Sequence, residues 1–87
     1  MKEKVIVVSN KMGLHARPAA MLVQTMTRYQ STVKILKDDF EVDAKNIMGV
    51  MTLAAGHGSE LKFIINGPDE NETLFAIEGL FKSNFSE

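Results

Sequence analysis

Cysteine is absent from the 87-residue sequence, so no disulfide stabilises the fold and no thiolate can hold a metal ion. A small disulfide-dependent secreted scaffold is therefore disfavoured. The N-terminal stretch also lacks a long apolar run. Val5 to Val8 are only four consecutive apolar residues, whereas a membrane-spanning helix needs about 20. We therefore expect a cytoplasmic protein without membrane insertion.

An excess of charge of one sign is missing too. The chain carries 10 Lys and Arg against 11 Asp and Glu, and it contains no run of basic residues. Proteins that bind nucleic acids usually have a basic excess, because neutralising phosphates supplies much of their affinity. Aromatic residues are few, five Phe and one Tyr, and they do not alternate with basic residues as a base-stacking surface would. A nucleic-acid-binding α+β domain is the weakest function we consider.

The apolar patterning predicts one α+β domain over residues 1–87. Alternation and turn residues predict four strands, at residues 4–8, 32–37, 40–44 and 60–66. Apolar spacing of three and four predicts helices over residues 16–28 and 47–53 and a third through Lys82. The element order is βαββαβα. Placing the fourth strand between the first two gives an antiparallel sheet of order 1-4-2-3, with the three helices on one face.

Helix-start signals and core positions follow from the same spacing. Asn46 is expected to cap the short second helix, and Asp69 with Glu72 has the form of a capping box at the third. The residues expected to face the core from the three helices are Ala19, Leu22, Val23 and Met26, then Val50, Leu53 and Ala54, and finally Leu74, Ile77, Leu80 and Phe81.

The segment that carries chemistry is Gly-Leu-His-Ala-Arg-Pro-Ala, residues 13–19. Pro18 suits the first turn of a helix, so His15 is expected at or just before the helix N-terminus. The backbone N–H groups of Ala16 and Arg17 then have no intrahelical acceptor. Free N–H groups, the positive end of the helix dipole and the Arg17 guanidinium together form a site for a phosphate-like anion.

A histidine in this position can act as a nucleophile. The helix N-terminus and Arg17 both disfavour a cationic ring, and a neutral imidazole has a free lone pair. If His15 attacked a phosphoryl group, the product would be an anion lying in an anion site. The alternative is that His15 is an ordinary surface residue at a helix start, and the local pattern alone leaves both interpretations open.

Two longer stretches resemble one family. NKMGLHARPAAMLVQ, residues 10–24, closely resembles the active-centre signature of HPr, the histidine-containing phosphocarrier of the bacterial phosphotransferase system. AKNIMGVMTLAAGHGSEL, residues 44–61, resembles the second signature of that family. The length, the element order and the Gly-Pro-Asp-Glu entry to the last helix also fit, so the resemblance extends over the whole chain.

The resemblance implies an open-faced β-sandwich that carries a phosphoryl group on Nδ1 of His15. Enzyme I, which draws on phosphoenolpyruvate, would be the donor, and an enzyme IIA domain the acceptor, with Arg17 as the partner of the phosphate. Such a protein is a substrate of its partners and not a stand-alone catalyst. We expect a monomer without a cofactor or a metal ion, since His57 lies in a glycine-rich turn and no further ligand motif accompanies the two histidines.

The family also docks its partners through the short second helix. Met48 and Met51 are one turn apart there, and methionine suits a surface that accepts several partners, although methionines are more often core residues. We favour exposure. The expected partner-binding residues are Ala20, Met21 and Gln24 on the first helix, with Ile47, Met48 and Met51 on the second.

Two positions depart from the family pattern. Asn46 stands where Gram-positive members carry a regulatory serine, so control by a serine kinase is not expected at that residue. Met12 stands where a small polar residue is frequent, as in the nitrogen-related branch of the family, whereas residues 47–51 resemble the sugar-transport branch. The branch stays open. A regulatory binding module, in which phosphorylation of His15 is incidental, is the main alternative function.

Overall fold

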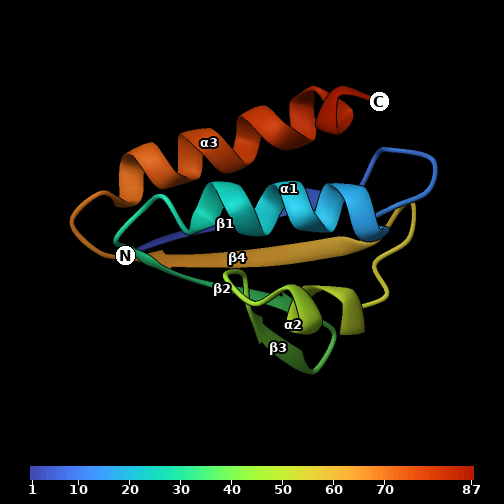
Figure 1. Cartoon of the computed structure of the whole chain (residues 1–87). Helices are drawn as coiled ribbons and strands as arrows, with labels where there is room; N and C mark the ends of the chain where they lie inside the picture. Colours follow the sequence, from blue (N-terminus) through green and yellow to red (C-terminus); the bar gives the residue numbers. More distant parts are fainter.

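The computed structural model describes residues 1–87, and the chain folds into four strands, three α-helices and a short 3₁₀ helix. Figure 1 shows the helices α1 and α3 lying side by side over the sheet, with α2 near the β3 edge. No helix has the length and apolar character needed to cross a membrane. In chain order the elements are β1 (Lys2–Val7), α1 (Ala16–Met26), β2 (Thr32–Lys37), β3 (Phe40–Asp43), α2 (Ile47–Thr52), β4 (Glu60–Asn66), α3 (Glu70–Lys82) and η1 (Asn84–Ser86).

The sheet has the predicted order, β1-β4-β2-β3, and every neighbouring pair is antiparallel. The fold class predicted from the sequence, an α+β open-faced sandwich, is thereby confirmed. Alternation in β4 sends Leu61, Phe63 and Ile65 under the helices, where all three are fully buried. On the other face Val5 and Val7 of β1 are about half exposed, at 54% and 52%.

The core joins this sheet face to the helices. Leu22 and Met26 of α1 and Ile77 of α3 are fully inaccessible to solvent. Phe81 of α3 meets the ring of Phe63 edge-on, with 5.6 Å between the ring centroids. Such aromatic pairs add to the stabilisation that comes from their burial.

The strands and helices predicted from the sequence are all present, but some of their predicted ends differ from those in the structure. The strand β1 begins two residues earlier than expected, α1 ends at Met26, and η1 was not predicted. Ala54 was expected in the core and is exposed, because its φ of 49° turns the chain after α2 and buries Ala55 instead. Val23, Leu74 and Leu80, also expected in the core, only flank it and are partly buried.

Asp69 does not form the predicted capping box. It occupies the N-cap position of α3, but its side chain makes no cap hydrogen bond. Its carboxylate instead accepts hydrogen bonds from the backbone N–H groups of Gln30 and Ser31, both at 2.9 Å, and from the Ser31 hydroxyl at 2.5 Å. These bonds lower the pKa of Asp69 from 3.8 to about 2, and the bond from the Ser31 hydroxyl has the largest effect. The carboxylate thus ties the start of α3 to the turn before β2.

We expect Asp69→Asn to lower the Tm at pH 7 by several degrees. A carboxyl group whose pKa falls on folding stabilises the folded state above the pKa of the unfolded chain, and that contribution is lost as the pH falls towards the folded value. The difference between the two proteins should therefore shrink between pH 4 and pH 2, a window set by the values 3.8 and about 2. Thermal unfolding across pH measures it. Asp39→Asn, at an exposed turn, is the control, and a difference that is constant with pH would contradict the assignment.

Candidate functional site

The loop between β1 and α1 is fixed against the segment after α2. Gly13 adopts a φ of 67°, and a Cβ at this position would lie 2.6 Å from Cα of Gly56, so only glycine fits. The next residue, Leu14, is buried and its N–H donates to the carbonyl of Ala55 at 2.8 Å. This contact sets the point at which the chain enters α1.

His15 is the N-cap residue of α1, as the sequence predicted. Its backbone is extended, with φ −73° and ψ −174°, and its carbonyl accepts the first helical hydrogen bond from Ala19 at 3.0 Å. The N–H groups of Ala16 and Arg17 find no acceptor in the chain, because the helix has no preceding turn. Two free donors at the positive end of α1 therefore adjoin the imidazole.

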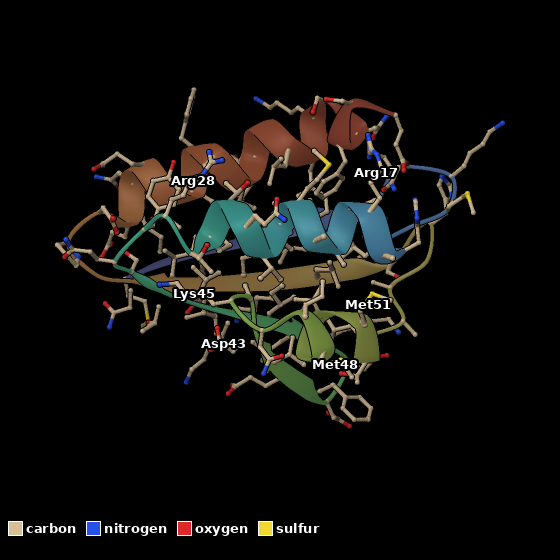
Figure 2. All side chains as sticks on the ribbon, in the orientation of Figure 1. Arg17, Arg28, Asp43, Lys45, Met48 and Met51 are labelled. Carbon is tan, nitrogen blue, oxygen red and sulfur yellow. The ribbon has the colours of Figure 1, made fainter.

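The turn η1 brings the end of the chain to this helix start. Phe85 has a left-handed backbone, with φ 55° and ψ 34°, and its ring is fully buried 4.9 Å from that of Phe81. The Phe85 carbonyl accepts from Nη1 and Nη2 of Arg17, at 2.9 and 2.7 Å. The predicted phosphate partner, Arg17, is thus oriented by the chain itself, and Figure 2 shows it where α1 begins.

Glu87 completes the surroundings of His15. Its Oε2 lies 2.7 Å from Nε2 of His15 and 3.8 Å from Nη1 of Arg17. Its other oxygen, Oε1, accepts from Nδ2 of Asn10 at 3.0 Å. The pKa of Glu87 lies below its usual range. The main cause is the hydrogen bond with His15, and the second is the hydrogen bond from Asn10. The carboxylate is consequently ionised near neutral pH.

Sequence reasoning missed Asn10, Phe85 and Glu87. His15 and Glu87 are 72 positions apart, and no local pattern connects them. The only available signal was the predicted topology, in which α3 returns the chain to the end of the sheet where α1 begins. No group of three or more His, Asp or Glu side chains is arranged to hold a metal ion.

The predicted partner residues lie on neighbouring parts of α1 and α2. Ala20 and Gln24 of α1 and Ile47 of α2 line one shallow hollow between the helices. Met48 and Met51 are 70% and 40% exposed, which confirms the preference for surface over core positions. Both project from α2 in Figure 2, with Met51 at the same end of the molecule as Arg17 in this view.

Two further contacts fix this surface. Met21 is partly buried, and its sulfur lies 3.5 Å from Nη1 of Arg17, which connects the surface to the site of His15. Asn46 caps α2 as predicted, since its side chain accepts from the N–H groups of Met48 and Gly49.

Fold and site together define a small α+β protein able to carry an anionic group on a histidine at a helix N-terminus. A family model described as "PTS HPr component phosphorylation site" matches residues 2–83. The chain therefore belongs to the HPr family, the phosphocarriers of the phosphotransferase system.

Individual relatives agree over the full length. The chain is 49% identical over 87 residues to the phosphocarrier protein HPr of Treponema pallidum, covering 100% of this chain and 99% of that protein. Its structure is similar to that of HPr from Thermoanaerobacter tengcongensis, with a TM-score of 0.96 at 45% identity and coverage of 100% and 98%. A dimer of HPr from the same organism matches with a TM-score of 0.80 at 45% identity, covering 100% of both chains.

Proposed function

We propose that the chain works as a single cytoplasmic domain that accepts a phosphoryl group on His15 from Enzyme I and donates it to enzyme IIA domains. The observation that carries this proposal is the position of His15 as N-cap of α1, next to the unpaired N–H groups of Ala16 and Arg17. A phosphoryl group on this ring would meet donors that the fold leaves free.

Nδ1 is the nitrogen that we propose as the acceptor. Nε2 contacts Glu87, whereas Nδ1 has no hydrogen-bond partner in the chain. The lone pair of Nδ1 attacks phosphorus, an N–P bond forms, and the bond from phosphorus to the donor breaks with its electron pair leaving on the donor. Transfer to an acceptor reverses these roles, and the pair of the N–P bond returns to Nδ1.

Arg17 has donors to spare for the phosphate. Two of its contacts go to the Phe85 carbonyl, and a guanidinium has five N–H groups in a planar fork. Remaining N–H groups can bind phosphate oxygens without release of Phe85. A cation held by the fold loses less conformational entropy on binding than a free side chain would.

We propose that partner proteins bind a surface on α1 and α2, which we call the docking surface. It consists of Ala20, Met21, Gln24, Ile47, Met48 and Met51. A partner must cover His15 to exchange the group, and this surface is continuous with His15 through Met21 and Arg17. Its exposed apolar side chains suit the apolar centre of a protein interface. Enzyme I and enzyme IIA would therefore bind the same surface in turn. The monomer that we expect stays a prediction, because a similar HPr forms a dimer.

His15→Ala should abolish phosphoryl acceptance and leave the fold unchanged, because the side chain is partly exposed and contributes little packing. Incubation with phosphoenolpyruvate and Enzyme I, followed by mass spectrometry under alkaline conditions, measures the product. His57→Ala, in the exposed turn after α2, is the matched control and should accept the group normally. An acid-labile phosphate on the His15→Ala protein would refute the proposal.

Met48→Asp should weaken binding to Enzyme I about 10-fold or more, because it places a charge in the apolar part of the docking surface. The free energy of unfolding should change by no more than about 0.5 kcal/mol, since the side chain is exposed. Titration calorimetry and denaturant unfolding measure the two quantities. Phe75→Asp, at a 78% exposed position on α3, is the control and should bind normally. Normal binding by Met48→Asp would exclude this surface.

A further inference from the structure

Phe40 is an exposed aromatic residue on the side of the sheet that the helices cover. In the register of β2 and β3, Val42 pairs with the buried Ile35, and Phe40, two residues before Val42, projects to the same side. Val42 is partly buried beneath α2, whereas Phe40 is 70% exposed. The short helix α2 therefore covers Val42 but leaves the ring of Phe40 open to solvent.

This ring continues the apolar surface of α2. The helix lies against β3 at Gly49, where a Cβ would come within 3.2 Å of Cβ of Val42. Met48, the residue before Gly49, is also 70% exposed, and Figure 2 shows it beside β3. Successive residues on one face of a strand are about 7 Å apart, so Phe40 is one such step from this contact. Phe40 thus adjoins the docking surface, whereas the equally exposed Phe75 lies apart from it on α3.

Charge is distributed unevenly around this surface. Residues 4–37 and 44–59, which include the whole of α1 and α2, contain no Asp or Glu. Three of the cations in these segments, Arg17, Arg28 and Lys45, are labelled in Figure 2. The segments that form the docking surface therefore offer a partner only positive charge, and acidic groups on the partner match it best.

The turn between β2 and β3 has the opposite charge. Asp38 and Asp39 come directly before Phe40, both are exposed, and neither makes an ion pair in the chain. Lys37 is the one basic residue beside them in the sequence, so the two carboxylates outnumber it. Asp38, Asp39 and Phe40 together form an acidic and aromatic tip, which we call the hairpin patch.

A partner that covers the docking surface must extend past it, because an interface between two proteins ordinarily uses about 20 to 30 residues on each side. We propose that the hairpin patch is a second part of the same interface. Phe40 enters an apolar pocket of the partner protein, and Asp38 and Asp39 face Lys or Arg side chains at the edge of that pocket. The inference rests on the proposed function and adds the chemistry of the partner, which carries acidic groups opposite α1 and a basic rim opposite β3.

Phe40→Ala should raise the Kd of the chain for Enzyme I, for an enzyme IIA domain, or for both, about fivefold or more, because it removes an aromatic anchor of the interface. The kcat for phosphoryl transfer should stay unchanged, since the surroundings of His15 are intact. Titration calorimetry with each purified protein and transfer kinetics measure the two quantities. Phe75→Ala, at a 78% exposed position on α3, is the matched control and should bind both proteins normally. An unchanged Kd for both proteins, or a fall in kcat alone, would overturn the proposal.

The double variant Asp38→Asn, Asp39→Asn tests the charge of the partner. Asn tolerates the left-handed φ of 55° at residue 38, so the turn should keep its shape. Binding of the partner that depends on Phe40 should weaken about threefold at low ionic strength, and the difference should disappear at about 1 M salt, where charges are screened. Unchanged or tighter binding at low ionic strength would contradict a basic rim on the partner. These failures differ from failure of the proposed function, in which His15→Ala would still accept the phosphoryl group.

Discussion

The central position of β4 in the sheet is the constraint on which the site depends. Because β4 lies between β1 and β2 and is antiparallel to both, the helix that follows β4 returns over the sheet in the direction of β1. The strand β1 leads into the loop before α1, so α3 ends where α1 begins, as Figure 1 shows. Burial of Phe85 against Phe81 then holds the end of the chain beside His15. Two contacts between residues far apart in the sequence, that of Arg17 with the Phe85 carbonyl and that of His15 with Glu87, thus complete a site that begins as a short sequence motif.

Two opposite electrostatic influences act on His15. The N-terminus of α1 and Arg17 favour negative charge beside the ring, whereas Glu87 favours a proton on Nε2. We propose that Nδ1 takes the anionic group, while Nε2, which contacts Glu87, stays a hydrogen-bond donor. This division suits a carrier, which must bind the phosphoryl group and also release it.

Local physics accounts for what could be predicted from the sequence. The alternation of apolar residues over 60–66 predicted the strand β4 and its buried face. The spacing of Ala19, Leu22 and Met26 predicted the helix α1 and its buried face, because the side chains that face the core recur with the period of the secondary structure. Pro18 placed His15 at a helix start. The role of Asp69 could not be predicted, since the partners of its carboxylate, Gln30 and Ser31, are brought near only by the assembled sheet. Glu87 was missed for the same reason, as η1 has no helical spacing and depends on tertiary contacts.

The location of the phosphoryl group is the most direct test of the account. The ¹⁵N-labelled chain, phosphorylated with phosphoenolpyruvate and Enzyme I, can be examined by ³¹P and ¹⁵N NMR, in which coupling to phosphorus identifies the bonded nitrogen. The account predicts phosphorus on Nδ1 of His15 and a hydrogen on Nε2. Phosphorus on Nε2 of His15, or on any other residue, would contradict it.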